Sequence, residues 1–142
     1  MTVYLSRRYS FTAAHRLHAP GLSDAENRAI YGKCNNPFGH GHDYQVEITV
    51  AGQVDPVTGR AVSLEELDAL ARREAVEPFR YRNLNEEVAA FRTAVPTTEN
   101  LATEVDRRLR HAWKDAFPGG SPRLEKIRIW ETPRNICEIS GE

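Results

Sequence analysis

Apolar and polar residues alternate along several stretches of this chain, which is typical of strands with one buried face. The alternation is clearest over residues 43–52, where the apolar and polar positions fall on opposite faces (Tyr44, Val46, Ile48 and Val50 against Gln45, Glu47 and Thr49). Residues 2–14 are rich in β-forming side chains without helical spacing, and residues 124–131 and 135–139 show the same preference for strand. We therefore expect four strands.

Helical spacing replaces alternation in two places. Ser63 and Glu66 form the pattern of a capping box, and apolar residues at helical intervals follow, which predicts a helix to about Ala75. Residues 96–99 open a second helix that ends at Pro118-Gly119-Gly120. Its apolar residues lie on one stripe: Leu101, Val105, Leu109 and Trp113.

The segment 19–33 contains Pro20, Gly21, Ser23, Asn27 and Gly32, among other turn-forming residues. This composition predicts a loop. Because the loop connects two segments that carry candidate ligands, we treat it as a candidate lid.

The predicted order is strand, loop, strand, helix, helix, strand, strand. This order indicates an α+β fold in which an antiparallel four-stranded sheet carries two helices on one face, within one domain that spans residues 1–142. Two helices leave both sheet edges open, and open edges favour pairing with another chain.

Composition restricts the functional classes. A formal net charge of −1 gives no field that would attract nucleic acid or an anionic membrane. No apolar run approaches the length of a membrane span, the N-terminus does not resemble a signal peptide, and two cysteines do not make a disulfide framework. We expect a cytoplasmic protein that binds neither nucleic acid nor membrane.

Three histidines carry the strongest chemical signal. His40 and His42 are two residues apart, so on a strand their side chains point to the same face, and His15 ends the first predicted strand. Three imidazoles with one open position are typical of catalytic zinc. Cys34 precedes His40 by six residues and offers a thiol close to the metal. Spacing alone leaves open whether these are metal ligands or ordinary hydrogen-bonded histidines.

Five segments decide between these alternatives, because together they resemble the 6-pyruvoyl-tetrahydropterin synthase family over nearly the whole chain and in the same order. The most specific is the stretch from Tyr31 to Tyr44, YGKCNNPFGHGHDY. The others are FTAAHRL at residues 11–17, PTTEN at 96–100 and IWET at 129–132, and NLN at 83–85 also matches. The family includes the 6-carboxytetrahydropterin synthases of queuosine biosynthesis, but the Cys-Asn-Asn spacing is more similar to the pyruvoyl branch.

The resemblance implies a tunnelling fold, in which three chains close a β-barrel and two trimers stack as a homohexamer with sites at subunit interfaces. It implies a zinc-dependent lyase that converts 7,8-dihydroneopterin triphosphate to 6-pyruvoyltetrahydropterin with loss of triphosphate. The resemblance assigns roles to eight residues. Zn2+ would be bound by His15, His40 and His42; Cys34 would accept a proton; Glu131 would bind the pterin N–H groups; and Thr97, Thr98 and Glu99 would line the same pocket.

The sequence departs from the family at one point. Arg80 and Tyr81 stand where the family has an Asp-His pair that assists proton transfer. Tyrosine with a pKa of about 10 is a poor base near pH 7, and arginine cannot relay protons. Three readings follow: the family reaction at a reduced rate, a related reaction such as 6-carboxytetrahydropterin synthase-like side-chain cleavage with Tyr81 as the acid, or a non-catalytic pterin- and zinc-binding paralogue.

Other charged residues have possible uses. Lys33, Arg80 and Arg82 could supply cationic partners for a triphosphate. Two further histidines remain: His18 could approach the site, and His111 is expected to be solvated on a helix. Retained Cys34 favours an enzyme over a binding protein, so the sequence predicts a lyase whose catalytic residues are Cys34, Tyr81 and Arg80.

Overall fold

A four-stranded antiparallel sheet forms the centre of the structure, which is a computed structural model that describes residues 1–141. The strands lie in the order of the sequence: β1 (Val3–His15), β2 (His40–Gly52), β3 (Arg123–Thr132) and β4 (Asn135–Ser140). All four predicted strands are confirmed. β2 begins at His40, three residues before the predicted start, because the backbone of residues 40–42 pairs with the end of β1.

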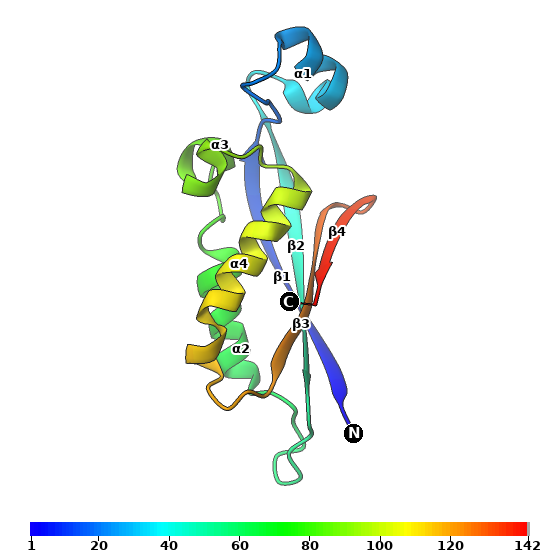
Figure 1. Cartoon of the computed structure of the whole chain (residues 1–142), viewed down its shortest axis with the longest axis vertical. Coiled ribbons are helices and arrows are strands. Elements are labelled where there is room, and N and C mark those ends of the chain that lie inside the picture. Colours follow the sequence, from blue (N-terminus) through cyan, green and yellow to red (C-terminus); the bar gives the residue numbers. More distant parts are fainter. Residues whose placement is uncertain (142) are drawn as a thin grey trace.

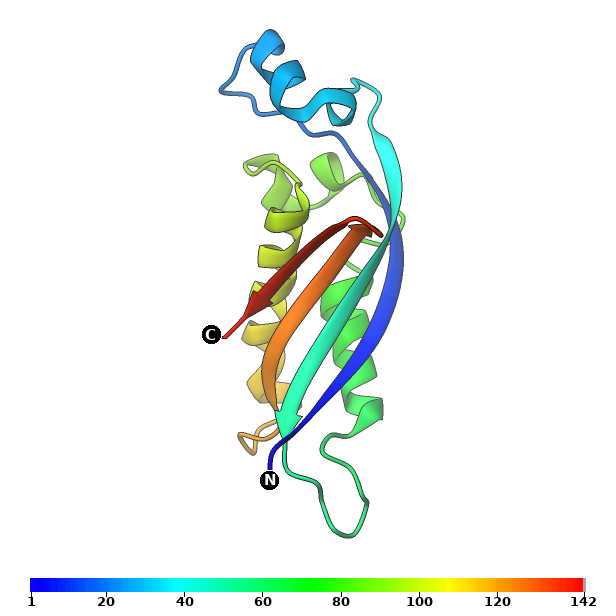
Figure 2. The ribbon, with the colours of Figure 1, turned by 90° about the vertical axis from the view of Figure 1, so that its right-hand side faces the viewer.

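The two predicted helices cover one face of this sheet (Figure 1), and within residues 1–141 the other face carries no helix (Figure 2). They are α2 (Leu64–Ala71), which continues as a π-helical turn (η2, Arg72–Val76), and α4 (Thr98–Ala116). Shorter helical pieces connect the main elements: α1 (Asp24–Tyr31), η1 (Gly32–Asn35), α3 (Leu84–Glu87) and η3 (Ala89–Arg92). The predicted α+β architecture with helices on one face is therefore confirmed.

The core lies between the sheet and α2 and α4. Apolar side chains from alternate strand positions are fully buried there, including Val46, Ile48, Ile127 and Ile129. They pack against the buried stripe of α4, of which Leu101, Val105 and Leu109 have no exposed surface. This burial is the largest stabilising term that the fold offers, since each buried aliphatic side chain contributes about 1.5–3 kcal/mol.

The loop prediction for residues 19–33 is wrong, because helix α1 occupies most of that segment. Ser23 accepts a hydrogen bond from the Glu26 amide, and the Glu26 side chain accepts one from the Ser23 amide, so a complete capping box starts the helix. The buried Asn27 side chain then fixes the incoming chain by bonding both the amide and the carbonyl of Ala19. Two of the turn-forming residues that suggested a loop, Ser23 and Gly32, cap the two ends of this helix. The segment stands at one end of the molecule (Figure 1), and its role as a lid stays a prediction.

The outer edge of β1 is partly occupied by the segment that follows η2. The Tyr81 amide donates to the Thr12 carbonyl (2.7 Å), and the Ala14 amide donates to the Arg82 carbonyl (2.9 Å). These bonds attach residues 81–83 to the last part of β1. No helix among residues 1–141 combines the length and apolar character needed to cross a membrane.

Candidate functional site

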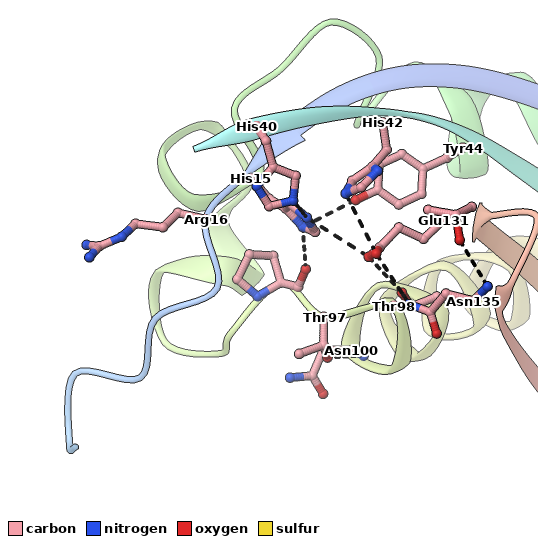
Figure 3. Close-up of polar contacts among 12 residues, drawn as sticks. His15, Arg16, His40, His42, Tyr44, Thr97, Thr98, Asn100, Glu131 and Asn135 are labelled. Carbon is pink, nitrogen blue, oxygen red and sulfur yellow. Dashed lines mark hydrogen bonds and ion pairs between the residues drawn. The ribbon is translucent and has the colours of Figure 1, made fainter. Parts of the chain in front are cut away.

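Three histidine side chains converge where β1 and β2 end. His15 lies opposite His40 in the antiparallel register, and Ala13 lies opposite His42, so the three imidazoles reach the same face of the sheet. Their rings are 4.6–5.0 Å apart between centroids, and one nitrogen from each lies within 4.8 Å of the others. Figure 3 shows the rings turned toward one another. The structure therefore brings together the three predicted ligands.

His15 is oriented by a backbone carbonyl. Its Nδ1 lies 2.8 Å from the carbonyl oxygen of Pro96, and only 1% of the residue is exposed. Because a carbonyl only accepts, Nδ1 must carry the hydrogen, which leaves the lone pair of Nε2 pointing into the cluster. A hydrogen bond of this kind fixes the tautomer and the orientation of a metal-binding histidine.

The donor set fits a metal ion. His42 Nε2 is buried and has no hydrogen-bond partner among residues 1–141, which is costly unless a ligand takes its lone pair. His15 Nε2 and His40 Nε2 lie only 3.0 Å apart. Zinc–nitrogen bonds of about 2.0–2.1 Å separate the nitrogens of a tetrahedral site by roughly 3.3 Å. Small side-chain rotations would therefore make a three-coordinate group with an open fourth position.

Burial keeps two of these imidazoles neutral. It lowers the pKa of His15, although the Pro96 carbonyl and Glu131 oppose the effect. It also lowers the pKa of His40, with a further contribution from His42. A metal ion binds the neutral form, so both shifts favour coordination near neutral pH.

Glu131 on β3 forms one wall of the cluster. Its Oε1 lies 3.6 Å from His42 Nε2, its Oε2 lies 4.0 Å from His15 Nε2, and only 8% of the residue is exposed. Thr98 donates to Oε2 (2.8 Å) and Asn135 donates to Oε1 (3.3 Å). These contacts hold the carboxylate against the imidazoles (Figure 3). Each oxygen accepts one of these two bonds, so one lone pair on each stays open to a ligand.

Asn135 is a site residue that the sequence reasoning missed. Besides Glu131 it bonds the Thr98 hydroxyl (3.0 Å), so it joins the start of α4 to the first residue of β4. An asparagine beside a turn is ordinary in sequence terms, and no motif marked it. Only the hairpin, which folds Asn135 back beside Glu131, gives it this position.

Thr97 and Glu99 flank Thr98 at the start of α4. The Thr97 hydroxyl accepts the Asn100 amide hydrogen (3.1 Å) and is thus the N-cap of the helix, while Glu99 is exposed in the first turn. Of the three residues predicted to line the pocket here, Thr98 is the one whose side chain contacts Glu131.

Cys34 belongs to the same electrostatic environment. Burial raises the pKa of the Cys34 thiol, and the Glu131 carboxylate raises it further. The charge of Cys34 in turn contributes to the raised pKa of Tyr44, whose hydroxyl lies 3.2 Å from His15 Nδ1. The Leu17 amide donates to the Cys34 carbonyl (2.8 Å), which holds η1 beside the end of β1.

Arg80 and Tyr81 are not brought to the histidines of their own chain. Tyr81 is 74% exposed and has a positive φ of 57°. The Arg80 guanidinium lies 4.8 Å from the centre of the Tyr81 ring and pairs with Glu77. Together with Thr12 and Asp43 they line a cleft of about 750 Å³ at the edge of the sheet, and none of the three histidines lines it. Arg80 and Tyr81 therefore lie in a different cleft from the three histidines of their own chain.

Comparisons with known proteins agree with this geometry. The family described as "6-pyruvoyl tetrahydropterin synthase" matches residues 4–142. A protein of Poecilia reticulata named 6-pyruvoyl tetrahydrobiopterin synthase is 44% identical over 139 residues, which cover 98% of this chain and 90% of the relative. The human protein of the same name is 41% identical over 138 residues, covering 97% and 91%.

A solved structure gives the same result. The structure of Caenorhabditis elegans 6-pyruvoyl tetrahydropterin synthase superimposes with a TM-score of 0.88 at 39% identity, and the match covers 100% of this chain and 97% of that one. Similarity thus extends over the complete fold. The chain belongs to the 6-pyruvoyl tetrahydropterin synthase family.

Proposed function

We propose that this chain is a zinc-dependent lyase that converts 7,8-dihydroneopterin triphosphate to 6-pyruvoyltetrahydropterin and releases triphosphate. One observation carries the proposal: a three-histidine group, with His15 buried and a buried His42 nitrogen that has no partner within residues 1–141, lies against a buried carboxylate in a chain of this family. The identities of 41–44% to relatives named for the pyruvoyl reaction favour it over the 6-carboxytetrahydropterin reaction.

The three histidines would hold the ion, and His15 is already fixed for this purpose by the Pro96 carbonyl. Zinc at this position would polarise an oxygen of the substrate side chain and so acidify the neighbouring C–H bond. The open fourth position is what distinguishes such a group from a structural site.

Cys34 is the proposed proton acceptor. Since burial and Glu131 both raise the pKa of its thiol, Cys34 needs a positive charge nearby before it can lose its proton. A zinc ion held by the three histidines would provide that positive charge. In the internal redox transfer, the electron pair of the broken C–H bond moves into the pterin ring, which takes up a proton, so that the ring is reduced as the side-chain alcohol is oxidised. In a separate elimination, a second C–H proton is lost and triphosphate leaves with the electron pair of its C–O bond.

Glu131 is the proposed acceptor for the pterin N–H groups. The bonds from Thr98 and Asn135 hold its carboxylate in one orientation, and the remaining lone pairs suit a two-donor edge. Thr97 and Glu99 would border the same pocket from the first turn of α4.

Arg80 and Tyr81 would act only across an interface between chains. Within one chain they lie at the β1 edge, exposed and outside the histidine cluster. An assembly that joins the edge of β1, where residues 81–83 do not cover it, to the edge of β4, such as a trimer within a homohexamer, would allow the pair to reach the site of a neighbouring chain.

A turnover assay tests the proposal. The zinc-loaded protein is incubated with 7,8-dihydroneopterin triphosphate, and triphosphate release and pterin products are followed by mass spectrometry. We expect a pyruvoyl product with equimolar triphosphate. A carboxyl product would instead assign the chain to 6-carboxytetrahydropterin synthesis, and an unchanged substrate that still binds would identify a non-catalytic paralogue.

A further inference from the structure

A second cleft adjoins the histidine cluster on the side away from Glu131. Its volume is about 470 Å³, within the range of ligand pockets. Arg16 and Gly39, the chain neighbours of His15 and His40, line it, and so does Pro96, whose carbonyl holds His15. In Figure 3 the Arg16 side chain points away from the cluster, opposite to the side on which Glu131 lies. The cleft therefore extends the candidate site beyond the three histidines, on the side opposite Glu131.

The charged side chains of this cleft are mainly basic. Arg16 and Arg92 line it together with His18, and Glu86 is its single acidic residue. Arg92 is exposed and forms no ion pair within residues 1–141, so its charge is not neutralised by the described chain. For Arg16, the side-chain bond within the same residues uses only Nε, which donates to the Asn35 carbonyl (3.1 Å). Its two terminal nitrogens stay free for a ligand.

His18 adds a donor whose orientation is fixed. Asn35 Nδ2 donates to the Leu17 carbonyl (2.8 Å), which can only accept, so this atom is the amide nitrogen. The same nitrogen lies 3.0 Å from His18 Nδ1, which must therefore accept. The hydrogen of a neutral His18 is consequently on Nε2, where it can be donated to an anionic oxygen.

We propose that this cleft binds the triphosphate of the substrate, with Arg16, Arg92 and His18 as its partners. The proposal rests on the proposed function, in which the pterin lies toward Glu131 and the side chain lies at the three histidines. The phosphate chain then extends into the basic cleft on the far side. Negative charge grows on the departing triphosphate oxygen as its bond to carbon breaks, so cations here would assist release as well as binding.

The structure thereby disfavours all three cations that the sequence suggested for this task. Arg80 pairs with Glu77 and stacks on Tyr81 in a different cleft, and the Arg82 carbonyl is bonded to β1 at the sheet edge. Neither residue lines the cleft beside the histidines. Lys33 does not line it either.

Binding of inorganic tripolyphosphate by the zinc-loaded protein tests the assignment without requiring turnover. We expect Arg92→Gln to weaken tripolyphosphate binding roughly tenfold and to raise KM for 7,8-dihydroneopterin triphosphate by a similar factor, since a charge-assisted hydrogen bond is lost. Affinity for 7,8-dihydroneopterin, which lacks the phosphates, should not change. Arg92→Lys should recover most of the loss.

Arg60→Gln is the matched control, because Arg60 is an exposed arginine in the loop between β2 and α2, and it should leave all three values unchanged. Arg16→Gln gives a second test of the cleft, with the Cys34 segment monitored because Arg16 also bonds Asn35. If neither Arg92→Gln nor Arg16→Gln weakens tripolyphosphate binding, or if the unmodified protein does not bind it, the assignment is wrong.

The outcomes separate this assignment from the proposed function. If the protein turns over its substrate while both variants bind tripolyphosphate normally, the function stands and the cleft assignment fails. If the protein shows no turnover but the variants lose tripolyphosphate, the anion cleft stands and the function fails. A loss confined to Arg80→Gln or Arg82→Gln would place the triphosphate at the other basic group and overturn the proposal.

Discussion

The histidine cluster and the Arg80–Tyr81 segment are assigned to the same reaction, yet the structure holds them in opposite ways. The imidazoles are packed against a carboxylate that two further side chains fix, and His15 is almost completely buried. Tyr81 is 74% exposed at a sheet edge and contacts mainly its neighbour Arg80. A single chain therefore preorganises the metal group, whereas Arg80 and Tyr81 have no reaction centre to act on unless a second chain provides it.

Substitutions in the histidine cluster should have the largest effect on metal content and turnover. His42→Ala or His40→Ala should remove the metal and abolish turnover, because two remaining imidazoles bind zinc poorly. Metal content per chain after dialysis measures the loss. His111→Ala, which changes an exposed histidine on α4, is the control. Stoichiometric zinc in both cluster variants would disprove the ligand assignment.

Cys34→Ala should keep the metal and the pterin affinity but lower kcat by about 10²–10⁴-fold, the usual contribution of a positioned proton acceptor. Cys137→Ala is the matched control, since Cys137 is also a half-buried free thiol but lies on β4. Steady-state kinetics and metal analysis of both variants separate the two effects. Undiminished kcat in Cys34→Ala would mean that another group takes the proton.

Mixtures of two variant chains can test whether the exposed Tyr81 acts in the site of a neighbouring chain. Tyr81→Phe should lower kcat by about tenfold or more if its hydroxyl transfers a proton in a neighbouring chain. Oligomers reassembled from Cys34→Ala and Tyr81→Phe chains should then regain turnover, because some sites combine an intact Cys34 with an intact Tyr81. Tyr4→Phe, at an exposed tyrosine near the start of β1, is the control. A mixture no more active than its components would remove Tyr81 from the catalytic residues.

The smallest expected effect is on stability, and it comes from Asp68, which lies outside both the histidine cluster and the Arg80–Tyr81 segment. Arg7 and Tyr9 on β1 donate to Asp68 on α2 at 2.9 and 2.6 Å, respectively. Burial alone would raise the pKa of Asp68, but the bonds from Tyr9 and Arg7 outweigh it and lower that pKa. Asp68→Asn should reduce the free energy of unfolding at pH 7 by about 1 kcal/mol, a value that partial exposure keeps small.

The pH dependence of this difference follows from the sign of the shift. Because the pKa of Asp68 is lower in the folded state, its contribution is complete above the unfolded value of about 3.9 and is lost as pH falls through the folded value. Urea denaturation of both proteins at pH 7 and near pH 3 would show the gap closing. If the two proteins differ in their free energy of unfolding by the same amount at both pH values, the ionised Asp68 carboxylate is not the source of the difference.

Local patterns in the sequence were sufficient for the parts of the fold that depend on periodicity. The alternation over residues 43–52 predicted a strand with one buried face, and the stripe at Leu101, Val105 and Leu109 predicted a helix against it. Both elements are observed, although residues 48–52 are buried on both faces of the strand. The segment 19–33 was misread because Ser23 and Asn27 are common in loops, whereas here Ser23 caps helix α1 and Asn27 lies within it. Which of these roles they take depends on the contacts with Ala19 and Glu26 that only the folded chain makes.

The sequence by itself determined the family, the four strands, the two main helices and the residue types of the metal group, because spacing and periodicity are local properties. Only the tertiary structure decided how those residues are held. The Pro96 carbonyl sets the tautomer of His15, Asn135 joins Thr98 to Glu131, and Arg16 faces a basic cleft with Arg92. These partners are 81, 37 and 76 positions apart (96 − 15, 135 − 98 and 92 − 16). Contacts over such separations follow from the pairing of β1, β2 and β3 and the packing of helices on them, which no local pattern specifies.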